Sequence, residues 1–173
     1  MMDKFKALVH FVIEECDPKQ LGAVRLNKIL WFSDVMAYRT TGETISGTKY
    51  VKRPRGPVPA AVVKTLEELK TEGRISVREP VERYDVREFS SLSNADTNLF
   101  SNVEMTIVKN IAKDICNNYT AGEISDLSHD VVWEAAAEGE EIPMCATLVS
   151  FTGDYRSDVT AWADKVVCNR MVC

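Results

Sequence analysis

The stretch "LGAVRLNKILWFSDVMAYRTTG", Leu21 to Gly42, contains the helical pattern around which the rest of the chain is organised. Four apolar residues recur in it at positions i, i+3, i+4 and i+6, namely Leu26, Ile29, Leu30 and Phe32. This spacing predicts a helix from about Leu21 to Tyr38 that stops at Gly42. Because the apolar stripe is wide, we expect this helix to lie near the centre of the core.

Two further helices are expected beside it. The first is marked by an apolar stripe and ends near Cys16, before Asp17-Pro18; its residues are Phe5, Leu8, Val9, Val12 and Ile13. The next runs from Ala60 to Glu72, is preceded by Pro57 and Pro59, and stops at Gly73. Its inward residues are predicted to be Val62, Val63, Leu66 and Leu69.

Between and after these helices the pattern changes. Residues 43–58 read as a loop with a short strand at Thr48–Lys52. From Arg74 the apolar period is two, with Ile75 and Val77 before Pro80, and Tyr84 and Val86 after it. This alternation predicts a charged β-hairpin, followed by a turn-rich segment at residues 90–101.

The second half of the chain reads as helical. Capping boxes at Ser101/Glu104 and Thr120/Glu123 open two helices. A short helix is also expected at Asp130–Ala137, and an apolar stripe predicts a last one at Ser157–Arg170. The fold class is therefore mainly α (α+β), a compact helical domain of about six to seven helices with a small central β-hairpin. At 173 residues, the chain suits one domain spanning residues 1–173.

Composition limits the function classes. The net charge is −5, with 10 Lys and Arg against 6 Asp and Glu in residues 1–60, and 11 against 20 in residues 61–173. A basic patch is possible, but a basic domain is not. No apolar run is long enough to cross a membrane, and the five scattered cysteines suit reduced thiols in the cytoplasm.

Enzymatic and metal sites have weak support. His129 stands between Ser128 and Asp130, but sequence neighbours rarely face one another as a catalytic triad, and no hydrolase or nucleotide-binding motif is present. Cys116, His129 and Cys145 have no common zinc-site spacing. We therefore expect no catalysis, no cofactor and no metal. A hydrolase using an exposed His129 remains the weakest alternative.

Nucleic-acid binding is a more serious alternative. Three helices followed by a charged hairpin is the order of a winged helix, and phosphates could be met by Lys49, Lys52, Arg53 and Arg55. The third helix, however, would enter the groove with Glu67, Glu68 and Glu72 exposed. A DNA-binding autorepressor is therefore the second hypothesis.

Protein binding is favoured by a pairing of aromatic and arginine residues. The stretch from residue 31 to residue 55 contains Trp31, Tyr38, Arg39, Tyr50, Arg53 and Arg55. The alternative is that Trp31 and Tyr50 belong to the core. Gly56 allows a backbone conformation that other residues disfavour, and Pro57 and Pro59 would stiffen the basic loop; a rigid loop loses less entropy when it binds.

Several segments together resemble the Panacea antitoxin domain family, which includes the SocA-like antitoxins and is common in prophages. They are "LNKILWFSDVMAYRTTGETISGTKYV" at residues 26–51, "RGPVPAAVVKTLEEL" at residues 55–69 and "ISDLSHDVVWEAAAEGEEIP" at residues 124–143. Two departures, Arg55 before Gly-Pro-Val and Trp31 near a usual Tyr, would alter a surface more than a fold.

The resemblance implies an antitoxin that neutralises a cognate toxin encoded beside it by direct protein binding. Antitoxins of this type are also associated with delivering the toxin to an ATP-dependent protease. The expected partner-binding residues are Trp31, Tyr38, Lys49, Tyr50, Lys52, Arg53, Arg55, Gly56 and Pro57. The motif residues expected to be structural are Leu26, Lys28, Phe32, Asp34, Gly47, Ser128, His129, Trp133 and Pro143. Among these, His129 and Trp133 are expected to hold the late helices against the Gly-Pro-Val turn.

Overall fold

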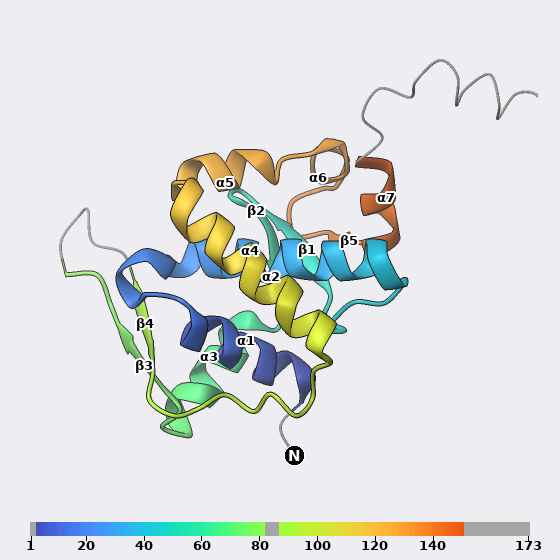
Figure 1. Cartoon of the computed structure of the whole chain (residues 1–173). Helices are drawn as coiled ribbons and strands as arrows, with labels where there is room; N and C mark the ends of the chain where they lie inside the picture. Colours follow the sequence, from blue (N-terminus) through green and yellow to red (C-terminus); the bar gives the residue numbers. More distant parts are fainter. Residues whose placement is uncertain (1–2, 82–86, 151–173) are drawn as a thin grey trace, which may run out of the picture.

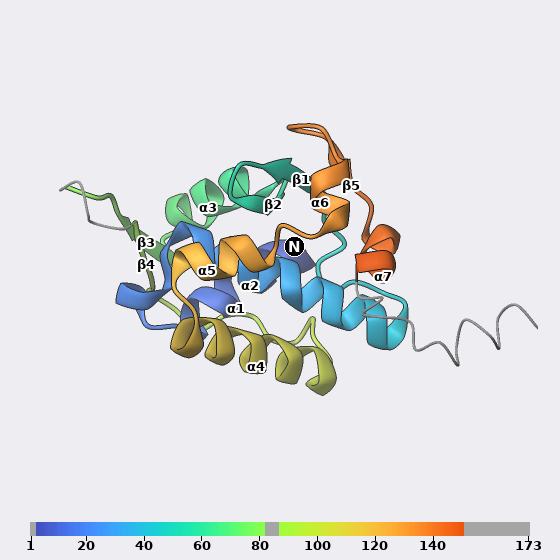
Figure 2. The ribbon, with the colours of Figure 1, turned by 90° about the horizontal axis from the view of Figure 1, so that it is seen from above.

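The computed structural model describes residues 3–81 and 87–150. Its central element is α2 (Pro18–Thr41), which lies between α4 (Asn102–Asn118) on one side and the β1–β2 hairpin on the other (Figure 2). Asp17 caps the start of α2 by accepting a hydrogen bond from the Lys19 amide. The central position expected from the wide apolar stripe is therefore confirmed.

The ends of α2 differ from the predicted boundaries. The helix begins at Pro18, but Gly22 has φ +56° and ψ 163°, which interrupts the helical backbone after the first turn. The regular apolar spacing of the sequence therefore belongs to the continuous helix that follows Gly22. At the other end Gly42 adopts φ +81°, and its amide donates to the Tyr38 carbonyl at 2.8 Å, as a helix-ending glycine does.

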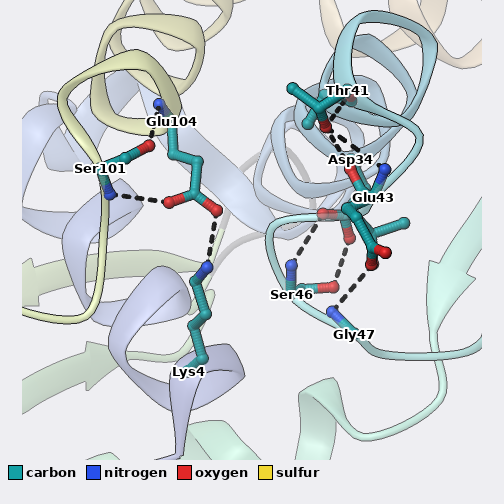
Figure 3. Close-up of polar contacts among 10 residues, drawn as sticks. Lys4, Asp34, Thr41, Glu43, Ser46, Gly47, Ser101 and Glu104 are labelled. Carbon is teal, nitrogen blue, oxygen red and sulfur yellow. Dashed lines mark hydrogen bonds and ion pairs between the residues drawn. The ribbon is translucent and has the colours of Figure 1, made fainter.

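Helices α1 (Lys4–Glu15) and α3 (Val62–Thr71) lie together below α2 (Figure 1). Helix α4 starts at the predicted capping box, in which the Ser101 and Glu104 side chains bond to each other's backbone amides. Figure 3 shows Lys4 of α1 reaching the same Glu104 carboxylate, at 2.6 Å. The core between these helices is built mainly of aliphatic residues, among them Leu8, Val12, Leu26, Ile29, Val108 and Ile115.

Two separate antiparallel sheets accompany the helices. One has the order β2 (Gly56–Pro59), β1 (Tyr50–Arg53), β5 (Glu141–Ile142), and the other pairs β3 (Ile75–Arg78) with β4 (Glu88–Ser91). The second sheet is the predicted central hairpin, and it extends away from the body of the molecule (Figures 1 and 2). The mainly α class with small β elements is confirmed.

Two local predictions were wrong, and a third lies partly outside the described residues. The predicted loop at residues 43–58 contains the β1–β2 hairpin, so Pro57 and Pro59 lie in a strand and do not open a helix. Val63 of α3 is 71% exposed, because the inward face of this short helix is formed by Val62, Thr65 and Leu69. The partner of β3 is Glu88–Ser91, and the expected strand residues Tyr84 and Val86 lie outside the described residues.

The later elements are short. They are α5 (Ala121–Leu127), α6 (Val131–Ala135), the 3₁₀ turn η1 (Met144–Ala146) and α7 (Thr147–Ser150). The predicted capping box of α5 is confirmed, and the short helix predicted at Asp130–Ala137 is α6, which Asp130 caps. The helix predicted at residues 157–170 lies outside the described residues. Across residues 3–81 and 87–150, no helix has the length and apolar character needed to cross a membrane.

Candidate partner-binding site

The β1–β2 hairpin is short and its tip is exposed. Strands β1 and β2 pair from Tyr50 opposite Pro59 to Arg53 opposite Gly56, so only Pro54 and Arg55 form the connection. The side chains of Arg53, Pro54 and Arg55 are exposed, whereas Gly56 and Pro57 are buried. The hairpin therefore presents a small basic tip on a buried base, above α2 and beside α5 and α6 (Figure 1).

Gly56 is in closest contact with its neighbours at the base of the hairpin. It adopts φ +95°, a conformation that favours glycine, and a Cβ at this position would overlap Ser128 Oγ and Lys28 Nζ. Residues from β2, α2 and the end of α5 therefore meet at one point without space for another side chain. The glycine of the Gly-Pro-Val segment is required both by its backbone angle and by this contact.

Lys28 reaches this point from α2 and is almost completely buried, with 1% of its surface exposed. Its ammonium group donates to the Pro57 carbonyl at 3.1 Å. Burial lowers the pKa of Lys28 to about 7, because a charged amine is poorly solvated in the interior. Lys28 thus fixes the backbone of β2, and a large share of its amine is neutral near pH 7.

Helix α5 holds the tip through two serines. Ser125 Oγ donates to the Arg55 carbonyl at 3.0 Å, and Ser128 Oγ donates to the Ser125 carbonyl at 2.6 Å. The Ser128 hydroxyl is therefore directed to the backbone of α5 and not to the neighbouring His129. This arrangement provides no activated serine nucleophile of the kind that the hydrolase alternative requires.

A stack of three side chains holds the hairpin from the α6 side. The rings of His129 and Trp133 are parallel within 10°, with centroids 3.7 Å apart, and Lys52 Nζ lies 4.2 Å from the centroid of the Trp133 ring. Trp133 Nε1 donates to the Arg53 carbonyl at 3.1 Å, and Lys52 Nζ donates to the Ala136 carbonyl at 2.8 Å. These contacts join the late helices to the hairpin.

The electrostatic surroundings of His129 disfavour its protonated form. Burial lowers the pKa of His129, the nearby charges of Lys28 and Lys52 lower it further, and Asp126 and Glu134 act in the opposite direction. Its Nε2 is buried and has no hydrogen-bond partner among the described residues. The imidazole serves here as a flat stacking partner for Trp133.

We call this group of contacts the hairpin clamp: Lys28, Ser125, Ser128, His129 and Trp133 acting on residues 52–57. A separate polar contact fixes the segment that leads into the hairpin. Figure 3 shows the buried Asp34 carboxylate accepting from the Ser46 amide, at 2.9 Å, and from the Ser46 hydroxyl. The Tyr50 hydroxyl donates to the same carboxylate at 2.7 Å.

Asp34 therefore ties α2 to the first residue of β1. Burial raises the pKa of its carboxyl group, while the hydrogen bonds from Ser46 and Tyr50 act to lower it. Gly47, in the same segment, adopts φ +65° and is exposed. The base of the hairpin is thus fixed from α2 at two places, Asp34 and Lys28.

The structure divides the expected partner-binding residues into two groups. Trp31 and Tyr50 are 2% and 1% exposed and pack edge to face, with centroids 4.9 Å apart, so they belong to the core and cannot contact a partner directly. Gly56 and Pro57 are also buried, which corrects their expected direct role. Lys49, Arg53 and Arg55 are exposed, while Tyr38 and Lys52 are half-buried.

The expected structural residues fall mostly in the interior. Leu26, Lys28, Asp34 and Ser128 are buried, and the half-buried ones are Phe32, His129 and Trp133. Pro143 is exposed and caps the 3₁₀ turn η1 next to β5. Sequence reasoning missed Ser125 of the hairpin clamp, and its only signal was its position one helical turn before Ser128.

The basic charges of the hairpin are partly neutralised by the acidic segment that includes β5. Lys49 Nζ lies 2.7 Å from Glu141, and Arg53 Nη1 lies 3.7 Å from Glu138. Glu68 of α3 and Glu72, the residue that follows this helix, both contact Lys6 of α1. The surface that a winged helix would turn toward phosphates is thus of mixed charge, which weakens the DNA-binding alternative.

An apolar groove that the sequence did not indicate lies on the other side of α2. It has a volume of about 250 Å³ between α2, α4 and α5, and its apolar lining includes Phe32, Val35, Met36, Ile111, Ile115 and Leu127. Met36 is 46% and Leu127 is 57% exposed. Their apolar spacing resembles that of core positions, so the sequence pattern cannot distinguish them from buried residues.

The suggested metal ligands are not assembled into a site. Across residues 3–81 and 87–150, no three His, Cys, Asp or Glu side chains are placed to hold a metal ion. Cys116 lies instead beside Cys16, and Cys145 is exposed. His129 is occupied by its stack on Trp133.

Comparison with known proteins places the chain in a family. Neither the curated proteins nor the solved structures that were searched include a match to it. The family model described as "Antitoxin SocA-like, Panacea domain" matches residues 26–134, which is more than half of the chain. The matched segment begins in α2, includes the whole hairpin clamp and ends directly after Trp133. This chain therefore belongs to the family of SocA-like antitoxins with a Panacea domain.

Proposed function

We propose that this protein is an antitoxin that neutralises a cognate toxin by binding it directly, without catalysis. The observation that carries the proposal is the hairpin clamp. Lys28, Ser125, Ser128 and Trp133 all act on the backbone of one hairpin whose tip remains exposed. Residues arranged in this way prepare a surface for a partner and do not surround a reacting group.

A fixed tip favours binding because its conformational entropy is already lost when the protein folds. Three backbone carbonyls of the hairpin, those of Arg53, Arg55 and Pro57, accept hydrogen bonds from side chains of other elements. The tip therefore has little freedom to lose when a toxin docks. This supports the basic loop as part of the toxin-binding face.

Arg55 is the residue of the tip best placed to contact a toxin. Its side chain is exposed, and among the described residues it has no ion pair or side-chain hydrogen bond. A hollow of about 370 Å³ lies beside it, lined by Ala23, Val24, Asn27, Lys28, Arg53, Pro54 and Val58. A protruding arginine next to a hollow suits a partner that offers a carboxylate beside an apolar side chain.

We place this activity in the cytoplasm, because the three cysteines of the described residues are free thiols, which suit a reducing compartment. Delivery of the bound toxin to an ATP-dependent protease is a further part of the proposal. It would require a second surface that stays accessible in the complex. The apolar groove between α2, α4 and α5 offers such a surface. Figure 2 shows α4 on the side of α2 opposite to the hairpin.

The test is co-expression of the chain with the protein encoded by the adjacent reading frame, with growth and co-purification as readouts. Rescue of growth with a stable complex would support neutralisation by binding. Rescue without a complex, together with repression of a reporter fused to the operon's promoter, would favour the DNA-binding alternative. A harmless neighbour that neither binds nor affects growth would contradict the proposal.

Two charged variants then locate the binding surface. Arg55→Glu changes the hairpin tip, and Leu127→Asp changes the apolar groove; both side chains are exposed, so neither variant should affect folding strongly. Loss of the complex in Arg55→Glu alone would support the hairpin tip. Loss in Leu127→Asp alone would transfer the toxin-binding face to the groove and overturn the role assigned to the tip.

A further inference from the structure

A pair of cysteines outside the hairpin clamp is placed for oxidation. Cys16 ends α1 and is 9% exposed, and Cys116 lies in the last turn of α4 and is half-buried. Their Sγ atoms are 3.9 Å apart, although the residues are 100 positions apart in the chain. Apolar residues of similar size could fill the same space, so packing alone does not require cysteines at these two positions.

Solvent and small oxidants can reach this pair. A cleft of about 350 Å³ is lined by both cysteines, together with Glu15, Gln20, Lys109 and Lys113. The cleft also contains Asp17 and three small or amide residues of α4, so its rim is mostly polar. A water-soluble oxidant therefore has access to thiols that are otherwise protected inside the fold.

The two thiols are electrostatically unequal. The hydrogen bond between the thiols and the charge of Arg25 lower the pKa of Cys116 to about 7, against the opposing effect of burial. The same contact with Cys116, together with burial, raises the pKa of Cys16 far above its usual range. Arg25 is held near α4 by donating to the Tyr119 carbonyl, from Nη2 at 2.8 Å and from Nε at 3.2 Å.

We propose that Cys16 and Cys116 are a peroxide-sensitive thiol pair that oxidises reversibly to an intramolecular disulfide between the end of α1 and α4. This inference is independent of the proposed function, because it rests only on the geometry of the pair and its cleft. It assigns different roles to the two residues. Cys116 is the attacking thiol and Cys16 is the resolving thiol.

The chemistry balances with hydrogen peroxide as the oxidant. The Cys116 thiolate attacks one peroxide oxygen, the O–O bond breaks, hydroxide leaves and takes up a proton as water, and Cys116 becomes a sulfenic acid. The Cys16 sulfur then attacks the sulfenic sulfur. The S–O bond breaks, the S–S bond forms, and the hydroxyl leaves with the Cys16 proton as a second water. Two electrons pass from the thiol pair to one peroxide, and a dithiol such as dithiothreitol reverses the reaction.

The test uses the full chain with the other three cysteines replaced, Cys145→Ser, Cys168→Ser and Cys173→Ser, so that only the pair remains. After treatment with hydrogen peroxide, we expect both free thiols to be lost together. Peptide mapping should show one species in which the Cys16 and Cys116 peptides are joined, with the loss of two hydrogens. Dithiothreitol should restore both thiols.

Closing a loop of this length should also raise the melting temperature, by roughly 5–15 °C, because the cross-link restricts the unfolded chain. In the same background, Cys16→Ser removes the resolving thiol. The sulfenic acid of Cys116 should then be trapped by dimedone in at least tenfold higher yield than in the paired protein. A merely structural pair would show no such difference.

Two results would overturn the proposal. One is that both thiols stay free at a peroxide concentration that oxidises the exposed Cys145 of the unmodified sequence completely. The other is that Cys116 in the paired protein proceeds to sulfinic acid without forming the disulfide. Cys116→Ser is the matched control, and in it Cys16 should react with neither peroxide nor dimedone at the same concentrations.

Discussion

Gly56 lies against the Ser128 hydroxyl with no room for a Cβ between the two residues. They are 72 positions apart in the chain, and their contact joins β2 to the end of α5. Lys28 approaches the same side of Gly56 from α2. The hairpin therefore cannot shift on its base without separating three elements, and this relationship leads to the first prediction.

Gly56→Ala should destabilise the protein by about 2–4 kcal/mol. The methyl group would be strained at φ +95° and would push the Lys28 ammonium away from the Pro57 carbonyl. Gly42→Ala is the matched control, because Gly42 also has a positive φ but has nothing within 4 Å of a Cβ, so it should cost only about 1 kcal/mol. Urea denaturation would measure both, and equal losses would contradict the importance of the close contact.

Trp133→Phe should cost about 1 kcal/mol, because it keeps an aromatic ring against His129 and loses the indole hydrogen bond to the Arg53 carbonyl. Trp133→Ala should cost more, about 2–3 kcal/mol. A fully buried ring would cost roughly 3–5 kcal/mol, but Trp133 is half-buried. Thermal and urea denaturation followed by circular dichroism would test this order. A Phe variant as unstable as the Ala variant would show that the hydrogen bond matters more than the ring.

Tyr50→Phe should destabilise the protein by about 1–3 kcal/mol, because the buried Asp34 carboxylate would lose one of its donors. Burial, and then the Asp34 charge, raise the pKa of Tyr50 well above its usual value, so the hydroxyl remains a donor at neutral pH. Tyr38→Phe is the control, since Tyr38 is half-buried without a hydroxyl hydrogen bond among the described residues. Its change should stay within about 0.5 kcal/mol. Equal losses would mean that Asp34 does not depend on Tyr50.

Local signals were the part of the fold that the sequence predicted well. Ser101 with Glu104 and Thr120 with Glu123 identified two helix starts correctly, because a capping box is complete within four residues. The central helix was also predictable, since its apolar spacing reports directly on burial. These features depend on neighbours along the chain.

Contacts between distant segments could not be predicted in the same way. Strand β5 has two residues and pairs with Tyr50 and Val51 about 90 positions earlier, so its own sequence shows no alternation. Trp31 and Tyr50 could equally have been surface residues, because aromatic residues favour both cores and interfaces. Their burial follows from the packing of one ring against the other, which composition does not reveal.

Arg55→Glu should weaken toxin binding at least tenfold without a change in stability, because the side chain is exposed and makes no ion pair among the described residues. Lys70→Glu, an equal charge change at an exposed position of α3, should leave binding unchanged. Lys52 is a poor choice for this test, because it holds the Trp133 ring and the Ala136 carbonyl. Titration of purified partners would measure the affinities, and an unaffected Arg55→Glu would exclude the tip as a contact.

Lys28→Met should change how stability depends on pH. The pKa of Lys28 is about 7 in the folded protein and 10.5 as the ordinary value, so between these the unfolded chain binds more protons than the folded one. Lys28 therefore makes the free energy of unfolding rise with pH across this window, by at most ~1.4 kcal/mol per pH unit. Below pH 7 both states are protonated and the contribution is constant.

The measurement is urea denaturation of the wild type and Lys28→Met at pH 6.5, 8 and 9.5. The wild type should gain stability relative to the variant as the pH rises, because other groups, such as Tyr50 and the Cys16–Cys116 pair, titrate in both proteins and cancel in the difference. Lys70→Met, which changes an exposed lysine, should run parallel to the wild type. If Lys28→Met also runs parallel, the Lys28 amine stays charged inside the hairpin clamp, and its bond to the Pro57 carbonyl is that of an ammonium group throughout this pH range.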